Sequence, residues 1–473
     1  MGVNTEMGKG GAPAPERAKP ALPGDPADGL PPMDDPAWLH PAGGDGPAGE
    51  AVADASETSV LELPRIARAL RHRDFRLFWT GNFLSNIGTW MQNVAQGWLV
   101  LHLTNSAFWL GLVGFAATIP ILVFALVGGV IADHVNNRKL LMATQSVMMV
   151  SAFIMAVLAS AKVITPNEIV VLALVNGIAM SLNTPSYQTL VPQLVPREDL
   201  TNAIAVNSAQ FNMSRVLGPT LGGFIMALVG SSFPGNIYAG AAGNFFLNGM
   251  SFLAVIFVLT RIHYPPRDSP PEGHLWGKLQ QGFTYVFSHG HMSPLVVLTA
   301  IASLLALPYL IFVPYFARDV LHSDERGLGL LMACSGVGAF FGAVTIAYRA
   351  KIRRRGVFVV RAGTGFFLAI VLFTFSRNFL FSGLMLMAAG YFMVIMVATI
   401  NALLQHLAED SMRGRVMSIY STAFLGLPPI GSLAAGFLAR VITPAHAIAG
   451  MSALALLGTW AVFAGKRELR ELD

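Results

Sequence analysis

Residues 107–139 read AFWLGLVGFAATIPILVFALVGGVIADHVNNRK, and this stretch decides the fold class. Its first part, 107–132, holds no charged side chain and is long enough to cross a hydrocarbon layer of about 30 Å as a helix. Charged residues begin at Asp133, directly after the apolar run. The pattern therefore predicts a transmembrane helix that ends in a short charged loop.

Apolar stretches of similar length recur along the chain. Hydrophobic residues make up 54% of the sequence and charged residues only 12%, against about 25% charged in an average soluble domain, which excludes a soluble fold. We therefore predict an all-α polytopic membrane protein with twelve transmembrane helices. They are expected at 75–101, 107–132, 139–161, 168–191, 201–229, 237–260, 293–317, 327–349, 357–376, 379–404, 415–439 and 445–465.

The sequence contains no pattern typical of a catalytic or metal centre. Its single cysteine, Cys334, cannot form an internal disulfide, and no zinc-type Cys/His spacing, phosphate-binding loop or nucleophile motif is found. We predict that the protein is not an enzyme and uses no cofactor or metal. The expected partners are membrane lipids and a small-molecule substrate, with no nucleic acid, and a monomer is expected.

The composition divides the chain into four parts. Residues 1–64 are rich in Pro, Gly and Ala and carry three basic and eleven acidic side chains, which predicts a disordered acidic tail. Residues 65–261 and 293–473 hold six predicted spans each. Between them, 262–292 form a linker with a short amphipathic helix from about 275 to 288. We expect two six-helix bundles joined by this linker.

The two six-span parts resemble each other when positions 213 residues apart are compared, as for 129 and 342. This separation is here called the repeat spacing. Matching pairs at this spacing are Gly129 with Gly342, Leu190 with Leu403, Ser208 with Ser421, Gly218 with Gly431, and Phe224 with Phe437. Two like-oriented halves predict a pseudo-two-fold axis along the membrane normal, with a binding cavity near the midplane between them.

The distribution of Lys and Arg predicts the orientation in the membrane. Of the 28 basic residues beyond the tail, 22 lie at one end of the spans and five at the other. Cytoplasmic loops carry the excess of basic residues. We therefore expect both termini and the linker on the cytoplasmic face of a bacterial inner membrane. The remaining basic residue, Arg215, falls inside a span.

The loop after the second span carries the first motif, Gly129-Val-Ile-Ala-Asp133-His-Val-Asn136-Asn-Arg138-Lys139. It resembles the signature loop of the major facilitator superfamily, with Asn136 in place of a glycine. The resemblance implies a gating latch in which Gly129 allows close helix approach and Asp133 acts with Arg138 and Lys139. Asn136 is expected to keep the left-handed turn. The alternative is that both basic residues are ordinary cytoplasmic charges.

The fifth span carries the second motif, Gly218-Pro219-Thr-Leu-Gly222-Gly223. It resembles the G-P-x-x-G-G element of exporters within this superfamily. Gly218 and Gly222 form a small-residue face for close helix packing, and Pro219 bends the helix. On the eighth span, Gly338 and Gly342 are the expected partners of this face.

Further segments are similar to the enterobactin-exporter and macrolide-efflux branch, also called the drug:proton antiporter-3 group. They are Asp74–Trp79, Asn82–Gln92, Pro196–Ala203, Asn207 with Ser208, and Arg215–Pro219. The resemblance covers about residues 70–465. It implies a secondary transporter, an exporter of a small amphipathic siderophore-like or drug-like molecule, that works by alternating access and allows proton coupling.

Amide side chains gather on the spans that line the cavity in this superfamily. In the first span Asn82, Asn86, Thr89, Asn93 and Gln96 form one helical stripe. Within a bilayer such side chains face the interior or water. The predicted cavity residues are Asn82, Asn86, Asn93, Gln96, Asn183, Tyr187, Gln188, Asn207, Gln210, Arg215 and Asn401. The alternative for each amide is hydrogen bonding between helices, worth about 0.6 kcal/mol per contact.

Arg215 has two interpretations. An arginine at mid-membrane costs about 2.5 to 3.5 kcal/mol on insertion scales, so something inside the bundle must compensate for its charge. In the first, Arg215 is an anchor for an anion or carbonyl group in the cavity, or a charge that changes partners between states. In the second, it is a structural tie to the backbone carbonyls of a broken neighbouring helix.

No acidic residue lies in the middle of a predicted span, although proton coupling normally needs a titratable group there. Glu168, Asp319 and His102, near the outer ends, are the candidates. The lack of a central carboxylate favours neutral or anionic cargo over cationic drugs. The alternatives to an exporter are a lipid or lysolipid flippase of the same fold and a non-transporting membrane sensor.

Overall fold

The computed structural model describes residues 65–233, 236–262, 275–348 and 354–472. All of them belong to one compact unit, Glu62–Asp473. Within these ranges every regular element is a helix, as the composition predicts. The predicted tail, 1–64, and the first part of the linker, 263–274, lie outside the described residues.

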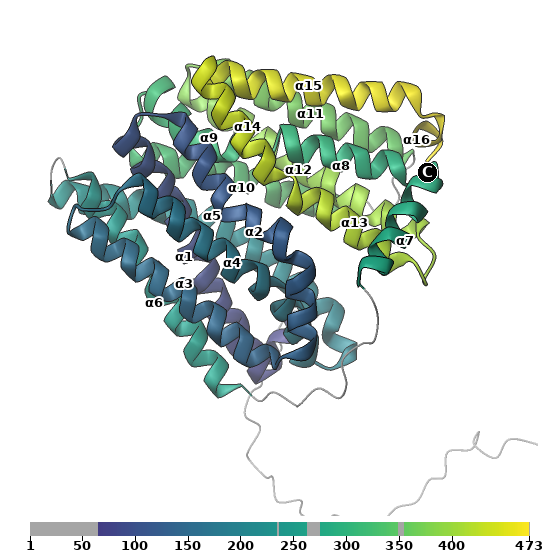
Figure 1. Cartoon of the computed structure of the whole chain (residues 1–473), viewed down its shortest axis with the longest axis horizontal. Coiled ribbons are helices and arrows are strands. Elements are labelled where there is room, and N and C mark those ends of the chain that lie inside the picture. The colour runs from purple at the N-terminus through teal and green to yellow at the C-terminus, as the bar shows by residue number, and fades with distance from the viewer. Residues whose placement is uncertain (1–64, 234–235, 263–274, 349–353, 473) are drawn as a thin grey trace, which may run out of the picture. The chain divides into compact units, whose positions relative to one another are not determined.

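The N-terminal half contains six long helices and three short 3₁₀ turns (Figure 1). Thr165 and Asn136 cap two of these helices with side-chain oxygens, which explains where those helices begin. The elements are η1 (Arg65–Arg71), α1 (Arg73–Thr104), α2 (Ala107–His134), α3 (Asn137–Ser160), α4 (Pro166–Leu190), η2 (Val191–Gln193), η3 (Arg197–Asp199), α5 (Leu200–Ser232) and α6 (Ile237–Arg261).

The C-terminal half begins after an amphipathic helix, α7 (Leu275–Ser288), which is close to the predicted range. Its elements are α8 (Ser293–Leu305), α9 (Tyr309–Tyr315), the π-helical turn η4 (Phe316–Val320), α10 (Glu325–Tyr348), α11 (Arg355–Phe375), α12 (Phe379–Leu407), α13 (Arg413–Gly426), α14 (Pro428–Val441), α15 (Pro444–Gly465) and α16 (Arg467–Glu471).

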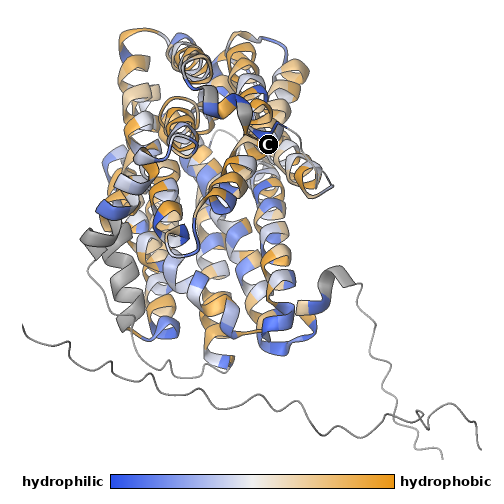
Figure 2. Cartoon of the chain, turned by 90° about the vertical axis from the view of Figure 1, so that its right-hand side faces the viewer, coloured by the Kyte–Doolittle hydropathy of each residue, from blue (hydrophilic) through white to orange (hydrophobic). Residues whose placement is uncertain are grey.

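Eleven segments of the described chain are long and apolar enough to cross a membrane. They include 293–320, where α8, α9 and η4 follow one another, and 413–441, where α13 and α14 do. The long helix α1 is not among them, because its amides lower its hydropathy. Once α1 is added, the segments are consistent with the twelve predicted spans. Figure 2 shows hydrophobic residues along most of the helices.

Two spans that the sequence predicts as continuous are interrupted. The seventh span breaks between Leu305 and Tyr309, where Pro308 lies, and the eleventh breaks at Leu427, directly before Pro428. Proline lacks the amide hydrogen that an inner turn needs, so a break at these points is expected from the residue type. The first break leaves Tyr309 fully buried between helices.

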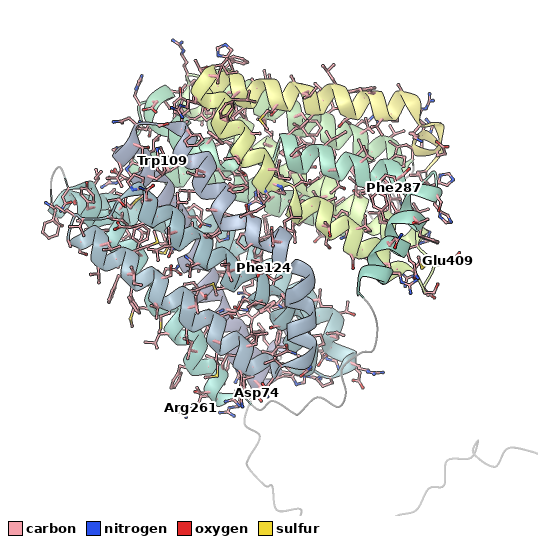
Figure 3. The ribbon with its side chains drawn as sticks, viewed as in Figure 1. Asp74, Trp109, Phe124, Arg261, Phe287 and Glu409 are labelled. Carbon is pink, nitrogen blue, oxygen red and sulfur yellow. The ribbon has the colours of Figure 1, made fainter. Side chains whose placement is uncertain are left out.

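The start of α1 and the end of α15 lie toward the same end of the helices, here called the terminal end (Figure 1). The loops that follow α1 and α3 lie at the other end, here called the opposite end. In Figure 3, Asp74, Arg261, Phe287 and Glu409 mark the terminal end of the two halves, and Trp109 marks the opposite end.

The sequence repeat is visible in the packing as well. Gly218 packs against the backbone of Ile87 in α1, and its partner in the repeat, Gly431, packs against Leu304 in α8. Both helices are the first span of their half. A side chain at either glycine would collide with that backbone, so the repeat preserves a close helix contact in each half.

The most extensive contacts between the two halves are made by two helix pairs, α5 with α10 and α2 with α14. A β-carbon at Gly223 would lie 3.0 Å from the Cα atom of Gly329, and one at Gly436 would lie 3.1 Å from the Cα atom of Gly111. Gly223 and Gly436 are again one repeat spacing apart. The repeat therefore supplies one glycine of each of these two contacts from an equivalent position.

The predicted partners of the fifth span are wrong. Gly338 and Gly342 of α10 pack against Met387 and Tyr391 of α12, within the C-terminal half. Their helix instead uses Gly329 and Gly336 to approach α5. Glycines occur on two faces of α10, and spacing alone does not tell which face turns toward which neighbour.

Candidate functional site

The halves are joined at the opposite end by two polar contacts. The indole Nε1 of Trp98 in α1 donates to Oε1 of Glu325 in α10 over 3.1 Å. Arg318 in η4 donates from Nη1 to the backbone carbonyl of Leu101 over 2.9 Å. Both contacts cross from one half to the other. Sequence reasoning missed them, because each joins positions in different halves that no local pattern connects.

One face of α1 shows where the contact between the halves stops. Gly97 faces Pro314 of α9, and a β-carbon there would lie 3.0 Å from the Pro314 Cγ atom. Asn93, one turn closer to the terminal end on the same face, is exposed. An exposed amide in the middle of a membrane span faces water inside the protein. On this face of α1 the contact between the halves therefore ends between Gly97 and Asn93.

Tyr187 of α4 brings three spans together in the N-terminal half. The side chains of Asn82 in α1 and Asn207 in α5 both interact with its hydroxyl. The ring of Phe78 lies 5.4 Å from the Tyr187 ring, centroid to centroid. Three of the predicted cavity residues therefore form one polar cluster, here called the Tyr187 cluster.

A stripe of buried polar atoms continues from this cluster along α5. Among the described residues, Asn207 Oδ1, Gln210 Nε2 and Ser214 Oγ have no hydrogen-bond partner. They lie at offsets 0, 3 and 7, so they share one helix face. Buried polar groups are normally paired, and a run of three without partners marks a place that accommodates water or a polar ligand.

Arg215 follows directly on this stripe and is only 9% exposed. Its Cζ atom lies 5.9 Å from the Trp90 ring centroid, and Tyr309 of the C-terminal half is close enough to interact electrostatically. In the described part of the chain its Nη2 atom has no hydrogen-bond partner and no carboxylate pairs with it. The predicted tie to carbonyls of a broken helix is not among its contacts.

The C-terminal half contains a related pair at the equivalent spans. Asn401 of α12 interacts with the hydroxyl of Tyr420 of α13, which also donates to the Val397 carbonyl over 3.3 Å. Tyr420 is the repeat partner of Asn207, and Asn401 is the partner of Gln188. In the N-terminal half the tyrosine lies on the fourth span and an amide on the fifth. In the C-terminal half the amide lies on the equivalent of the fourth span and the tyrosine on the equivalent of the fifth. The repeat arithmetic could have identified Tyr420 from the sequence.

The other predicted cavity residues differ in their surroundings. Gln188 is exposed, Asn86 is partly buried, and Gln96 is buried with 7% exposure. Asn183 points toward α3, since its Oδ1 accepts from Thr144 Oγ1 over 3.1 Å and from a second side chain of α3. Asn183 thus matches the alternative of hydrogen bonding between helices.

The predicted latch is described in part. Gly129 and Asp133 lie in α2 but outside the residues whose side chains the structure describes. Arg138 donates to the Thr260 carbonyl of α6 over 3.0 Å. The backbone of Asn136 has φ −60°, so the expected left-handed turn is wrong, and its side chain instead caps α3 by accepting from the backbone nitrogen of Lys139.

The three candidates for proton coupling occupy structural positions at the opposite end. Glu168 belongs to a capping box with Thr165. Asp319 pairs with Arg318 over 2.7 Å. The Nδ1 atom of His102 lies 3.0 Å from the Trp98 carbonyl oxygen, and the His102 ring lies 4.7 Å from the Trp98 ring. Two of them adjoin a contact between the halves, His102 beside Trp98 and Asp319 beside Arg318.

A family model for transmembrane secretion effectors matches residues 67–473. The chain belongs to this family of the major facilitator superfamily. It is therefore a multi-pass membrane transporter and not an enzyme, and the transporters of this superfamily need no cofactor. Proton coupling is common among them.

Curated relatives are similar over most of their length. The staphyloferrin A transporter of Staphylococcus aureus is 23% identical over 80% of this chain and 94% of the relative. The enterobactin exporter of Citrobacter koseri is 27% identical over 79% of this chain and 87% of the relative.

Solved structures agree in fold. A nucleoside transporter matches with a TM-score of 0.62 at 13% identity, over 83% of this chain and 98% of that one. A D-xylose-proton symporter matches with a TM-score of 0.62 at 15% identity, over 84% of this chain and 98% of that one. The predicted fold class, an all-α membrane protein of the major facilitator type, is confirmed, and the described segments are consistent with the predicted count of twelve spans.

Proposed function

We propose that this protein exports a small amphipathic, oxygen-rich molecule of the siderophore type from the cytoplasm across a bacterial inner membrane. The observation that carries the proposal is Arg215, a buried guanidinium without a carboxylate partner among the described residues, about two turns along α5 from Asn207 of the Tyr187 cluster. Similarity to a staphyloferrin A transporter and to enterobactin exporters supports the same class of cargo.

Direction follows from charge and from the contacts between the halves. The excess of Lys and Arg at the terminal end favours its placement in the cytoplasm. Entry of cargo from the cytoplasm is supported by two observations: Asn93 is exposed on the terminal side of Gly97, and the Trp98–Glu325 contact joins the halves at the opposite end. Rocking of the halves about the binding site would break this contact and release the cargo outside.

The chemistry of the site favours an anionic or neutral cargo. Arg215 offers a planar set of donors that suits carboxylate-like oxygens, while Asn207 and Gln210 offer an acceptor and a donor within two turns. Trp90 and Phe78 supply apolar faces beside these groups. A cation would meet Arg215 without any described carboxylate to balance the charge.

Energy coupling is proposed to involve protons taken up at the opposite end. Glu325 accepts a hydrogen bond that holds the halves together, and protonation would remove the charge that strengthens this bond. A proton gradient directed inward would then favour opening of that end. No carboxylate within the spans is needed for this arrangement.

The test is export from cells with and without the gene, using enterobactin, staphyloferrin A, a macrolide and a lysolipid as cargo. We expect the two siderophores to be exported and the lysolipid to be unaffected. Export of the lysolipid alone would indicate a flippase, and no change in any cargo would indicate a sensor. Transport into proteoliposomes with and without a pH gradient tests the coupling.

A further inference from the structure

The N-terminal half begins with an ionic junction at the terminal end. The side chain of Asp199, 1% exposed at the start of α5, binds Arg68 and Arg71 of η1 over 3.0 Å each and His72 over 2.7 Å. Next to them the Ala69 backbone nitrogen donates to Asn202 Oδ1 over 2.8 Å. A carboxylate surrounded by three basic side chains therefore holds η1 on α5.

The C-terminal half begins with a junction of the same geometry. Gly282 of α7 packs against Arg415 of α13, and a β-carbon there would lie 3.1 Å from the Arg415 carbonyl oxygen. Gly282 is the repeat partner of Ala69, and Arg415 is the repeat partner of Asn202. The helix that precedes each half thus docks at equivalent positions on the fifth span of that half.

The side chains at the two junctions differ in charge. The repeat partners of Arg68, Arg71 and His72 are Gln281, Thr284 and Tyr285, and the partner of Asp199 is Met412. The carboxylate and its basic partners are therefore replaced by neutral groups. At the position of the neutral Asn202, the C-terminal junction carries Arg415.

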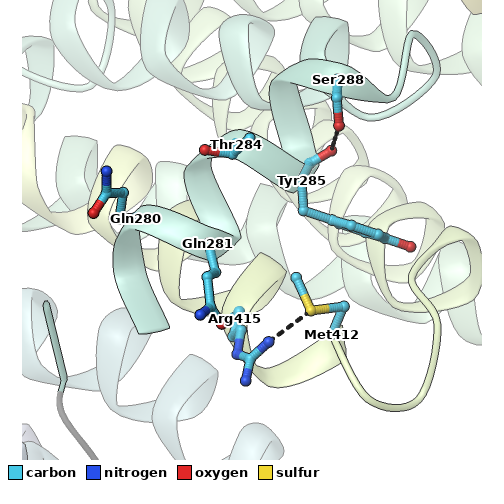
Figure 4. Close-up of a pocket in the computed structure, with 7 residues that line it drawn as sticks. All are labelled: Gln280, Gln281, Thr284, Tyr285, Ser288, Met412 and Arg415. Carbon is cyan, nitrogen blue, oxygen red and sulfur yellow. Dashed lines mark hydrogen bonds between the residues drawn. The ribbon is translucent and has the colours of Figure 1, made fainter. Parts of the chain in front are cut away.

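The replaced side chains leave a groove of about 530 Å³ between α7 and α13. Figure 4 shows Gln280, Gln281, Thr284, Tyr285 and Ser288 on the α7 side, with Met412 and Arg415 on the other. Arg415 is half-buried, and its side-chain hydrogen bond goes to Met412 Sδ over 2.9 Å. No carboxylate is among the described residues that line the groove. The nearby Asp410 already pairs with Arg413 over 2.6 Å.

We propose that this groove binds a phosphate-type oxyanion, whose charge takes the place that the Asp199 carboxylate has in the N-terminal half. Arg415 supplies the planar donors that suit phosphate oxygens. Thr284, Tyr285 and the glutamine amides supply neutral donors around it. The groove is too large for a single carboxylate side chain but accommodates a phosphate group with its substituent. This binding site does not depend on the cargo proposed above.

The phosphate has two chemical sources at this position. Phe283 and Phe287, whose tilted rings have centroids 4.4 Å apart, are 55% and 45% exposed on α7, which suits a helix lying in the membrane interface. A phospholipid headgroup of the adjacent leaflet therefore reaches the groove. Soluble phosphate reaches it from the aqueous side. The bound anion would fasten α7 to the C-terminal half as Asp199 fastens η1 to the N-terminal half.

The experiment uses the full-length protein in dodecyl maltoside, a detergent that contains no phosphate. In one arm inorganic phosphate is titrated, and in the other phosphatidylglycerol is added to the micelles. The melting temperature reports binding of either probe, because a ligand of the folded state raises it. We expect at least one probe to stabilise the protein. A lipid source predicts the larger effect from phosphatidylglycerol, and a soluble source predicts it from inorganic phosphate.

Three variants connect the effect to the groove. Arg415→Gln should weaken binding at least about ten-fold, as expected for a lost charge-assisted hydrogen bond. Met412→Asp should restore the carboxylate of the N-terminal junction, raise the melting temperature without any anion, and abolish the response to both probes. Arg413→Gln is the matched control and should bind as the wild type does, since its guanidinium already pairs with Asp410.

Three results would overturn the proposal. One is that neither probe changes the melting temperature of the wild type. Another is that Arg413→Gln weakens binding as much as Arg415→Gln, which would indicate a general effect of surface charge. The third is that Met412→Asp responds to both probes like the wild type, a result that holds even if Arg415→Gln fails to fold.

Discussion

The two halves of the membrane part share their helix packing but bury different side chains. In the described chain every buried Asn, Gln, Asp or Arg belongs to the N-terminal half, and the buried polar residues of the C-terminal half are Ser and Thr alone. Both halves also bury large aromatic side chains, which in the C-terminal half include Phe312, Phe316, Phe366, Phe367 and Phe373. Equivalent glycines nevertheless make the same contacts in both halves.

This difference suggests a division of labour between the halves. Buried amides are costly in an apolar surrounding unless they are paired, so their confinement to one half points to a role there that packing does not explain. We infer that the N-terminal half holds the cargo and that the C-terminal half provides an apolar surface against which it rocks. The predictions below test this division.

The largest expected effect is at Arg215. Arg215→Met should lower transport of an anionic cargo at least about a hundred-fold, because it removes the charge-assisted hydrogen bonds to the cargo while keeping most of the side-chain volume. The measurement is export from cells at matched protein levels. Arg440→Met is the control. The Arg440 guanidinium also lies 5.9 Å from an aromatic ring, that of Phe108. Arg440 is in the last turn of α14, however, far from the Tyr187 cluster.

Failure of Arg215→Met to accumulate in the membrane would support the structural interpretation of this residue. Normal export of the anionic cargo by a well-folded Arg215→Met protein would contradict its role as an anchor.

The next effect concerns the contacts that both halves share. Gly223→Leu and Gly436→Leu should each reduce transport at least about ten-fold, because a side chain at either position collides with the backbone of the other half and prevents closure of the opposite end. Gly230→Leu, on the same helix as Gly223 but with open space around it, should transport normally.

Here the two halves are expected to respond alike. If only one of the two leucine variants loses transport, the halves do not close through equivalent contacts, and the packing repeat has no mechanical meaning.

A smaller effect should separate the halves at their tyrosines. Tyr187→Phe should raise the KM for cargo about five- to ten-fold, the value of one hydrogen bond of about 1 kcal/mol, because Tyr187 lies in the proposed binding cluster. Tyr420→Phe should change KM about two-fold or less, since its hydroxyl already serves the Val397 carbonyl. Equal changes in the two variants would place cargo recognition in both halves.

The smallest effect is expected at the opposite end. Glu325→Gln keeps an acceptor for the Trp98 indole but removes its charge, so the closed state should lose stability by about 1 kcal/mol. Labelling of a cysteine introduced at Asn93, which is exposed on the same face of α1, in a Cys334→Ser background, should become about five-fold faster from the outside. The control Asp324→Asn changes the neighbouring carboxylate, which caps Gly327, and should leave the rate unchanged.

Much of this fold can be predicted from the sequence. The number and length of the spans are visible as apolar runs, and the relation between the halves is visible as matching residues at the repeat spacing. The interruption at Pro308 is also explained by residue type, although the continuous apolar pattern hides it. What the sequence does not determine is the rotation of each helix about its axis. That rotation decides that Gly329 rather than Gly338 faces α5, and that Asn183 turns to α3.

The site was predictable to a similar extent. The helical stripe identifies Asn82 and Asn93, and the cost of a buried charge identifies Arg215. Contacts between distant segments, such as Trp98 with Glu325, leave no trace in local periodicity. Asp199 was also missed, because an acidic residue at the end of a span is ordinary until Arg68 and Arg71 are found beside it.

The most direct test of cargo loading in the N-terminal half from the cytoplasm is uptake of labelled staphyloferrin A or enterobactin into inside-out membrane vesicles. We predict uptake by the wild type and by Arg440→Met, and none above protein-free vesicles by Arg215→Met. Equal uptake by Arg215→Met and wild type, or uptake by right-side-out vesicles alone, would contradict this account.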